Sequence, residues 1–503
     1  MTKSVLIIGA GLGGLFTGAI LAKEGLKVTV LEKNSSIGGG LQSFCRFNEV
    51  FDTGMHIVCG MQPNGNIRRI CRYLGIEDKI KIRQNNSDCC DVLYFEEDHQ
   101  RYSIATGKEG FIRSLSNYFP DEKENLEEYV KAIFNISNKV DLFNLRPSEG
   151  YVGMDFFQST DDFLMPADGF IAKYIKNPKL RSIVAYTNTL YGGRAGVTPA
   201  YIHAIISSSY INGISRFENS SGDFAKLLAN VITDNGGEIY TNEKAACILT
   251  EGRNITGVKT DNDNLYQSDI YISDIHPCSL IKITDSQALP KSYRSRLECI
   301  PNSYSAFSLY IKLKNSAFEY LDYCEYFMTD YSKVWDFGKV SDQWPLGFMF
   351  MTPPRTGQGR YAATALVTAP MPFDTVRQWE KTISGHRGHD YETFKHIQTV
   401  NILKQLDKFH PGFQGCIENV LSSTPLTIRD YYGVVDGALF GFSKDCNNIM
   451  LSQVPVATKL SNLFLTGQNV SLHGFCGVPL TAVMTSEAVL GNNYIINKLR
   501  NEQ

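Results

Sequence analysis

The chain has 503 residues, of which 43% are hydrophobic and 20% charged, and its formal net charge is −3. This length allows two or three domains, each with a full core. A protein with a small negative net charge has no overall attraction for a polyanion, so we expect no nucleic-acid partner.

The N-terminal apolar run is fragmented by glycines at positions 9, 11, 13 and 14 and ends at Lys23 and Glu24. No stretch of the sequence reaches about 18 uninterrupted apolar residues. We therefore expect neither a signal peptide nor a transmembrane helix, and a cytoplasmic protein that at most sits on a membrane surface.

The chain contains twelve cysteines and no CxxC pair, and Cys89 and Cys90 are adjacent rather than spaced for a metal. No Ser-His-Asp or metal-ligating constellation stands out. The pattern predicts reduced structural thiols in a cytosolic protein and no metal site.

The first forty residues predict a βαβ unit. Residues 4–8 form a short β-branched run typical of a buried parallel strand, residues 15–24 read as a helix ended by Gly25, and residues 26–31 read as the second strand.

The glycines between strand and helix have the spacing of a diphosphate loop. Gly9 permits the tight turn, Gly11 lets the backbone approach a pyrophosphate, and Gly14 lets the helix pack closely on the strand. Glu32 ends the second strand, where a carboxylate accepts hydrogen bonds from ribose hydroxyls. The unit predicts dinucleotide binding, with the phosphates at the helix N-terminus.

Two further segments favour FAD over NAD. The glycine cluster at positions 38–40 lets the backbone pass close to a larger cofactor. Near the C-terminus, residues 462–465 predict a strand, Gly467 a turn, and Gly474 and Gly477 the opening of a helix over about 478–490. That helix start can present N–H groups to a flavin edge, so both ends of the chain would grip one long cofactor.

The middle of the chain adds a third piece of this domain. A helix leads to Gly236 and Gly237, followed by a strand over 238–240, a hairpin across 251–254 and a strand over 269–273.

Taken together, these segments resemble the flavin-dependent amine-oxidase and phytoene-desaturase superfamily. The stretches "FDTGMHIVCG" and "NLFLTGQNVSLHGFCG" are most similar to its retinol-saturase and carotenoid-desaturase/isomerase branch. The resemblance implies an α/β fold in which a Rossmann-like FAD-binding domain of the glutathione-reductase type is interleaved with an α+β substrate domain. It places the following residues on cofactor or pocket-lining positions: Gly9, Gly11, Gly14, Glu32, Lys33, Gly38, Gly39, Gly40, Asp52, Gly54, Ala245, Gly467, Asn469, Gly477 and Val478.

The sequence departs from this branch at three places. Gly40 stands where many relatives place an arginine against the flavin, Asn469 stands where they usually carry an acidic residue, and "RFENSSG" over 216–222 replaces their "YPxGG" segment. The last departure bears on the substrate entrance.

We expect the FAD-binding domain to comprise residues 1–85, 220–290 and 436–503, and the substrate-binding domain residues 86–219 and 291–435. Within the latter, aromatic and helical patterns fill the first block, including 151–170 and 200–213. The second block alternates like strands over 303–313, 346–354 and 360–371, before a helix over about 391–408. An antiparallel sheet covered by helices would roof a tunnel over the flavin, and the aromatic content weakly favours an apolar substrate.

His56 and His473 are the candidate catalytic residues, as proton donors near the flavin. We interpret Asp52 as a loop organiser, Tyr431 and Tyr432 as lining the tunnel, and His276 as a helix-start residue. We expect Cys476 to be only a packing residue, and the alternative is that its thiolate is reactive beside the flavin.

These features predict an FAD-dependent oxidoreductase that acts on carbon–carbon double bonds of a hydrophobic polyene or isoprenoid. The reaction would need an external electron donor or acceptor. Peripheral contact with a membrane is left open by the sequence. The alternatives are a flavin-dependent cis–trans polyene isomerase and a lipid-escort protein of the same fold without redox activity. Amine oxidation is less favoured because no aromatic cage is evident near His473 and Phe475.

Overall fold

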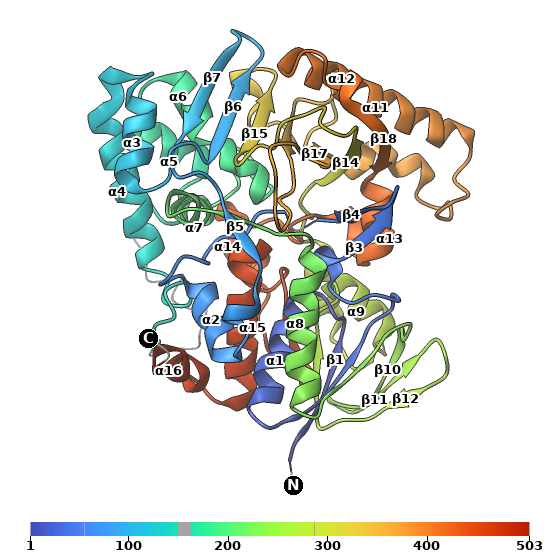
Figure 1. Cartoon of the computed structure of the whole chain (residues 1–503). Helices are drawn as coiled ribbons and strands as arrows, with labels where there is room; N and C mark the ends of the chain where they lie inside the picture. The colour runs from blue at the N-terminus through green and yellow to red at the C-terminus, as the bar shows by residue number, and fades with distance from the viewer. Residues whose placement is uncertain (1, 55, 149–161, 286, 502–503) are drawn as a thin grey trace.

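The computed structural model describes residues 2–54, 56–148, 162–285 and 287–501. The described chain forms two halves, a lower one around a parallel sheet near the N-terminus and an upper one around a large mixed sheet (Figure 1). The aromatic segment over 151–161 lies outside the described residues.

The lower half is built on a five-stranded parallel sheet of order β19-β13-β1-β2-β9. Its strands come from distant parts of the sequence: β1 (Ser4–Ile8), β2 (Lys27–Leu31), β9 (Glu238–Tyr240), β13 (Ile270–Ser273) and β19 (Leu463–Leu465). Four of the five residues of β1 are buried, as expected for a central strand of a parallel sheet. The predicted strands are confirmed to within one residue at each end.

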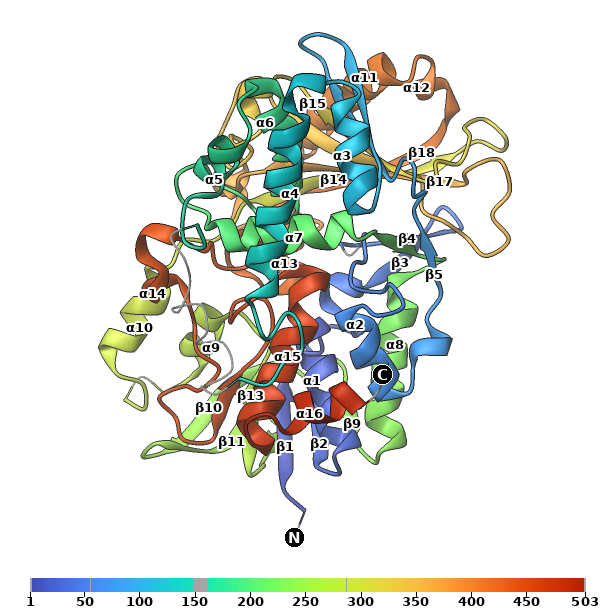
Figure 2. The same cartoon turned by 90° about the vertical axis from the view of Figure 1, so that its left-hand side faces the viewer.

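Three helices pack around this sheet, with α1 (Leu12–Lys23) between α8 (Ser221–Asp234) and α15 (Gly474–Leu490) (Figures 1 and 2). Helices α1 and α15 begin three and four residues earlier than predicted, since glycine-rich turns continue directly into helical backbone. At Gly25 the backbone is left-handed, with φ +84°, as the predicted helix end requires.

The predicted hairpin is confirmed as β10 (Ala245–Glu251) and β11 (Asn254–Thr260), and β12 (Leu265–Tyr266) extends it to a three-stranded antiparallel sheet. The chain also forms two small two-stranded antiparallel sheets. In one, β3 (Ser43–Arg46) pairs with β4 (Glu49–Asp52), and in the other, β5 (Ile82–Gln84) pairs with β8 (Ser215–Phe217).

The upper half contains a seven-stranded sheet of order β18-β14-β17-β16-β15-β6-β7. Its strands are β6 (Asp91–Phe95), β7 (Gln100–Ile104), β14 (Ser305–Leu313), β15 (Cys324–Met328), β16 (Gly347–Met351), β17 (Thr364–Met371) and β18 (Ile417–Ser423). The three strands predicted in the second block are β14, β16 and β17. The sheet is antiparallel, as expected, except that β6, contributed by the first block, joins β15 in parallel.

The two faces of this sheet pack differently because alternate residues point to opposite sides. Phe307 and Phe327 face a core formed with α11 (His389–Phe409) and α12 (Phe413–Cys416), whereas Tyr326 and Met328 belong to the main core of the molecule. The second face lies over helix α7 (Ala200–Ile211), which confirms the helical pattern predicted over 200–213.

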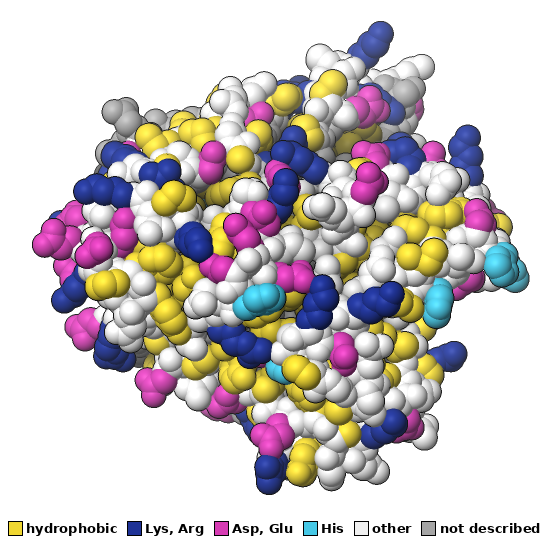
Figure 3. Space-filling model, turned by 90° about the horizontal axis from the view of Figure 1, so that it is seen from above, with side chains coloured by type: hydrophobic (Ala, Val, Ile, Leu, Met, Phe, Trp, Pro, Cys, Tyr) yellow, Lys and Arg dark blue, Asp and Glu magenta, His cyan; other side chains and the backbone are white. Residues whose placement is uncertain are grey.

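The other described α-helices are α2 (Asn66–Leu74), α3 (Lys108–Ser116), α4 (Lys123–Asn138), α5 (Ala167–Tyr174), α6 (Pro178–Val184), α9 (Pro277–Ile283), α10 (Lys291–Glu298), α13 (Pro425–Tyr432), α14 (Ile449–Ser452) and α16 (Tyr494–Asn501). Helices α3 to α6 stand along one side of the upper half (Figure 2). None of the helices in the described ranges combines the length and apolar character needed to cross a membrane. On the face seen in Figure 3, charges of both signs are interspersed with apolar side chains.

Candidate functional site

A cavity of about 270 Å³ connects the two halves. The lower half contributes the glycine-rich loops and the start of α15, and the upper half contributes one face of the seven-stranded sheet and residues of α7 and α13. Of the residues predicted from the sequence, the following line it: Gly11, Gly39, Gly40, Gly54, His56, Asn469, His473 and Val478.

The first glycine loop has the tight packing that a phosphate-binding turn requires. A Cβ atom at Gly14 would overlap the carbonyl oxygen of Gly9, so helix α1 can follow β1 this closely only with glycine there. A Cβ atom at Gly13 would lie 2.7 Å from the Cα of Gly467, which brings the two ends of the chain together at this turn.

Asp274, which sequence reasoning missed, points its carboxylate into this loop. It follows β13, and a Cβ atom at Gly11 would lie 2.5 Å from its Oδ2. Burial raises its pKa to about 7, against the opposing effect of hydrogen bonds from the backbone N–H of Gly14 and Gly11. The same N–H groups would meet a diphosphate, so a carboxylate occupies the position that favours an anion.

Glu32 lies at the end of β2, as predicted, with its side chain directed back to the turn. Its Oε2 accepts from the N–H of Ala10 at 3.0 Å, and its Oε1 accepts from the N–H of Asn34 at 2.9 Å. The N–H of Glu243 donates to its carbonyl oxygen at 2.8 Å, which places the start of β10, and therefore Ala245, beside this acidic residue.

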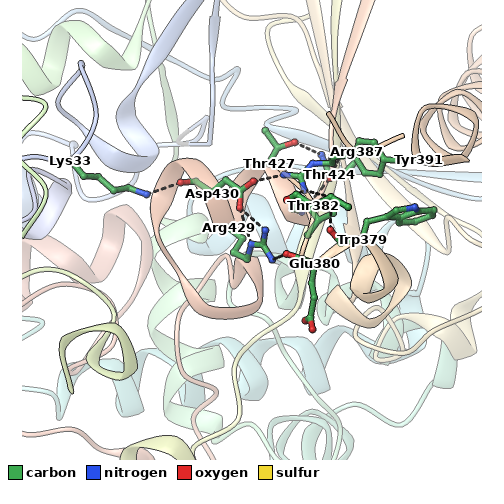
Figure 4. A network of polar contacts seen from close by, with 11 residues as sticks. Lys33, Trp379, Glu380, Thr382, Arg387, Tyr391, Thr424, Thr427, Arg429 and Asp430 are labelled. Carbon is green, nitrogen blue, oxygen red and sulfur yellow. Dashed lines mark hydrogen bonds and ion pairs between the residues drawn. The ribbon is translucent and has the colours of Figure 1, made fainter. Parts of the chain in front are cut away.

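Lys33 turns toward the upper half rather than toward the cavity. Its Nζ donates to the carbonyl oxygen of Asp430 in α13 at 2.6 Å, and Asp430 forms ion pairs with Arg387 and Arg429 (Figure 4). Arg387 also donates to the carbonyl and hydroxyl of Thr382, each at 2.9 Å. We call this group, formed by Lys33, Thr382, Arg387, Arg429 and Asp430, the α13 network.

The second glycine cluster meets α13 as well. The hydroxyl of Tyr432 donates to Thr53 Oγ1 at 3.1 Å and lies against Gly54, and Tyr432 lines the cavity beside Gly40. Tyr431 does not line it, contrary to expectation, because its side chain is 53% exposed at the surface. Consecutive helical residues point in different directions, so only one of the two could face inward.

Asp52 binds a backbone N–H, as the interpretation of a loop organiser expects, although this N–H belongs to a distant element. Its Oδ1 accepts from the N–H of Ser221 at the start of α8, at 2.9 Å. Burial raises its pKa to about 6. The segment over 216–222 is the one in which the sequence departs from the retinol-saturase and carotenoid branch. It leads from β8 into α8, and Asp52 binds it at the start of α8.

Both candidate catalytic histidines line the cavity and both are neutral near pH 7. Burial lowers the pKa of His56 to about 4. Burial, helped by the charge of Lys444, lowers the pKa of His473 to about 3, and His473 Nε2 is buried without a hydrogen-bond partner in the described part of the chain. Neutral imidazoles can bind a polar atom but cannot supply an imidazolium proton.

Lys444, a second residue that sequence reasoning missed, is buried near His473. Its Nζ donates to the carbonyl oxygens of Ser452 and Val470, at 3.2 and 3.4 Å, and burial lowers its pKa to about 7. No local pattern marks it, since a single lysine in a loop is ordinarily a surface residue.

The C-terminal loop and α15 contain the last predicted residues. Asn469 Oδ1 accepts from the N–H of Phe442 at 3.1 Å, and a Cβ atom at Gly477 would lie 2.6 Å from the carbonyl carbon of Leu472. His276 is confirmed as the residue that starts α9, with its ring accepting from the N–H of Cys278 at 3.2 Å.

The expectation that all cysteines are reduced is wrong for one pair. Cys476, in the first turn of α15, forms a disulfide with Cys59, and the two Cα atoms are 5.7 Å apart. The other ten cysteines are free. A sequence separation of 417 residues and the absence of a CxxC pattern left no local signal for this bond.

The upper wall of the cavity is mainly apolar. Its residues come from α7, from strands of the seven-stranded sheet and from the loop after α13: Ile206, Tyr210, Ala306, Tyr326, Met328, Phe348, Met349, Pro370, Leu439 and Phe440. Such a surface suits an apolar molecule with few polar atoms.

Comparisons with known proteins agree with this geometry. A family model described as an NAD(P)-binding Rossmann-like domain matches residues 7–74. All-trans-retinol 13,14-reductase from Rattus norvegicus is 25% identical to this chain, covering 97% of it and 86% of the reductase. Prolycopene isomerase 2, chloroplastic, from an Oncidium hybrid cultivar is 24% identical, covering 96% of this chain and 83% of the isomerase.

Among solved structures, a triple mutant of putrescine oxidase matches with a TM-score of 0.66 at 12% identity, covering 99% of both chains. This likeness supports the fold. The expected α/β architecture with a Rossmann-like domain, and the resemblance to the retinol-saturase and carotenoid-isomerase branch, are both confirmed.

Proposed function

We propose that the chain is an FAD-dependent oxidoreductase that acts on a carbon–carbon double bond of a hydrophobic polyene or isoprenoid. The observation that carries this proposal is one continuous cavity that runs from the glycines of the first turn to an apolar wall contributed by the other half of the molecule. The relatives named as a retinol reductase and a prolycopene isomerase support the substrate class.

The residues of the lower half fit FAD. The glycines of the turn over 9–14 carry no side chain that would block backbone contact with a diphosphate, and the Glu32 carboxylate stands where the ribose would bind. The cavity continues past Gly39 and Gly40 to the start of α15, so it accommodates a cofactor longer than its diphosphate. One residue opposes the fit, because the Asp274 carboxylate must be protonated or turn away before a diphosphate can approach.

When bound, FAD would supply the transfer of a hydride to or from a carbon atom. The chain would bind the polyene against the face of the sheet that carries Ala306, Tyr326 and Met328 and would exclude water from it. His56 and His473, neutral and facing this space, would bind a polar atom of the substrate or cofactor. Lys444, with a pKa of about 7, is the group near His473 that could hold or release a proton at neutral pH.

A purified preparation tests the proposal in two steps. The protein should carry a flavin that is released as FAD on denaturation. The reduced holoprotein should then be incubated under anaerobic conditions with retinol, carotenoids and polyenoic lipids. The masses of the products should be measured by mass spectrometry. A gain of two hydrogen atoms indicates saturation, and a loss of two by the oxidised protein indicates desaturation.

An unchanged mass with altered geometry of the double bonds would select the isomerase, the second candidate, which the prolycopene isomerase relative supports. A colourless protein that FAD cannot reconstitute would overturn the proposal in favour of a lipid-escort role. A lipophilic substrate also favours peripheral contact with membranes, and a protein that ignores liposomes would contradict that part.

A further inference from the structure

The Cys59–Cys476 disulfide lies on the wall of the proposed cofactor cavity. Both residues line it, together with Gly11, Gly39 and His56. Their exposed fractions are 2% and 8%, so only a molecule inside the cavity can reach the sulfur atoms. Disulfides that only staple a fold have no need to face a functional cavity.

The two cysteines come from the two segments that frame this part of the site. Cys59 follows the loop that carries Thr53 and His56, and Cys476 lies in the first turn of α15, a helix of 17 residues. The partial positive charge of a helix N-terminus stabilises a thiolate, the form that takes part in thiol–disulfide exchange.

The groups around the pair do not oppose reduction. His56 and His473, three residues from Cys59 and Cys476 respectively, are neutral near pH 7 because burial lowers the pKa of each. Phe475 packs edge-on against Phe217 and close to Phe224, so the first turn of α15 has packing contacts besides the disulfide.

We propose that Cys59 and Cys476 form a redox-active pair, a second two-electron site that exchanges electrons with the flavin in the same cavity and accepts them from a small dithiol that enters it. This inference rests on the proposed function, because it assigns one source for the electrons that saturation of a double bond consumes.

The electron balance involves three redox couples: the small dithiol, the Cys59–Cys476 pair and the flavin. In the first step a dithiol breaks the Cys59–Cys476 bond by exchange, becomes a cyclic disulfide, and leaves two thiols on the protein. In the second step the two thiols re-form their bond and release two electrons and two protons, which the oxidised flavin takes up. The net result is oxidation of one dithiol and two-electron reduction of one flavin.

Anaerobic titration of the holoprotein with dithionite tests the pair directly. The wild-type protein should consume four electrons per flavin, two for the flavin and two for the disulfide. The double variant C59S/C476S should consume two, and so should C59S. The control C299S changes an exposed free cysteine and should again consume four electrons. Dithiothreitol should bleach the visible flavin band of the wild type and of C299S but not of the double variant.

Thiol counting provides a readout that needs neither flavin nor a folded variant. Denatured wild-type protein should show ten reactive thiols before reduction and twelve after it. Twelve thiols before reduction, or uptake of two electrons per flavin by the wild type, would overturn the inference while leaving the flavin assignment intact. A protein that binds no flavin would instead overturn the proposed function, whatever the thiol count.

Discussion

Gly13 and Gly467 lie near opposite ends of the sequence, yet a Cβ atom built on Gly13 would lie 2.7 Å from the Cα of Gly467. The turn between β1 and α1 therefore closes against the turn that follows β19. A side chain at Gly13 would displace the turn at Gly467, and a side chain at Gly467 would meet the carboxylate of Asp274, so the two ends of the chain and Asp274 pack together at the start of the cavity.

Gly13→Ala should separate these turns. Overpacking of this kind costs about 1–3 kcal/mol of unfolding free energy, and we expect FAD affinity to fall by about tenfold or more because the phosphate-binding turn shifts. Urea unfolding and equilibrium dialysis with FAD measure the two effects. Gly359→Ala is the matched control, since nothing lies within 4 Å of the added atom. A G13A protein with wild-type affinity would show that the turns can part freely.

FAD affinity should decrease as the pH rises through about 7. Asp274 has a pKa raised to about 7, so its carboxyl is neutral below that pH and becomes an anion facing the diphosphate above it. Asp274→Asn cannot ionise and should bind FAD about tenfold more tightly than the wild type at about pH 8, with little difference at about pH 6. Titration of the apoprotein with FAD at both pH values checks this. Parallel pH profiles for the two proteins would contradict it.

His473→Asn should lower turnover by about 10²-fold, the usual loss when one hydrogen bond to the reacting group is removed, while leaving the flavin content unchanged. The imidazole has an unpartnered Nε2 at the cavity wall, and the shorter amide would withdraw from the atom that it binds. Single-turnover kinetics with a compound that the anaerobic incubation shows to react, together with the flavin spectrum, separate a catalytic loss from a loss of cofactor. Unchanged turnover would reduce His473 to a packing role.

Lys444→Met should flatten the pH dependence of stability. The folded state lowers the pKa of Lys444 from 10.5 to about 7, so its contribution to stability is fully present above about 10.5 and is lost as the pH falls through about 7. The difference in unfolding free energy between wild type and K444M should therefore change with pH over this window, by at most about 1.4 kcal/mol per pH unit. Urea unfolding at several pH values measures it, and a constant difference would show that Lys444 keeps its ordinary pKa.

Arg387→Met should destabilise the α13 network. Arg387 is buried and paired with Asp430, whose carboxylate keeps its second ion pair with Arg429, so the removal of Arg387 should cost about 1–3 kcal/mol. The exposed pair of Arg360 and Glu319 offers a control of the same chemistry, and Arg360→Met should cost less than about 1 kcal/mol. Thermal unfolding of both variants compares them, and equal losses would show that burial of Arg387 does not matter.

Local patterns sufficed for the elements that local physics dictates. The strand, turn and helix over residues 4–24 follow from a β-branched run and correctly spaced glycines, and Glu32 was located by its distance along the chain from that turn. Helix starts were placed three or four residues late at α1 and α15, because glycine favours turns but does not prevent a helix from beginning.

The composition of the site depended on contacts that no window of sequence contains. The parallel pairing of β6 with β15, the carboxylate of Asp274 among the glycines, and the attachment of Lys33 to α13 each join segments more than a hundred residues apart. Sequence patterns report which face of an element is apolar, but they do not report which element will cover that face.

By itself, the sequence determined the Rossmann-like unit at the N-terminus, because its strand, turn and helix need particular residues at fixed short spacings. The tertiary structure alone decided which cysteines bond, which tyrosine of a neighbouring pair faces the cavity, and which histidines lose their charge. These properties depend on the distance and burial of groups brought together from remote segments, since both bonding and ionisation respond to neighbours in space rather than in sequence.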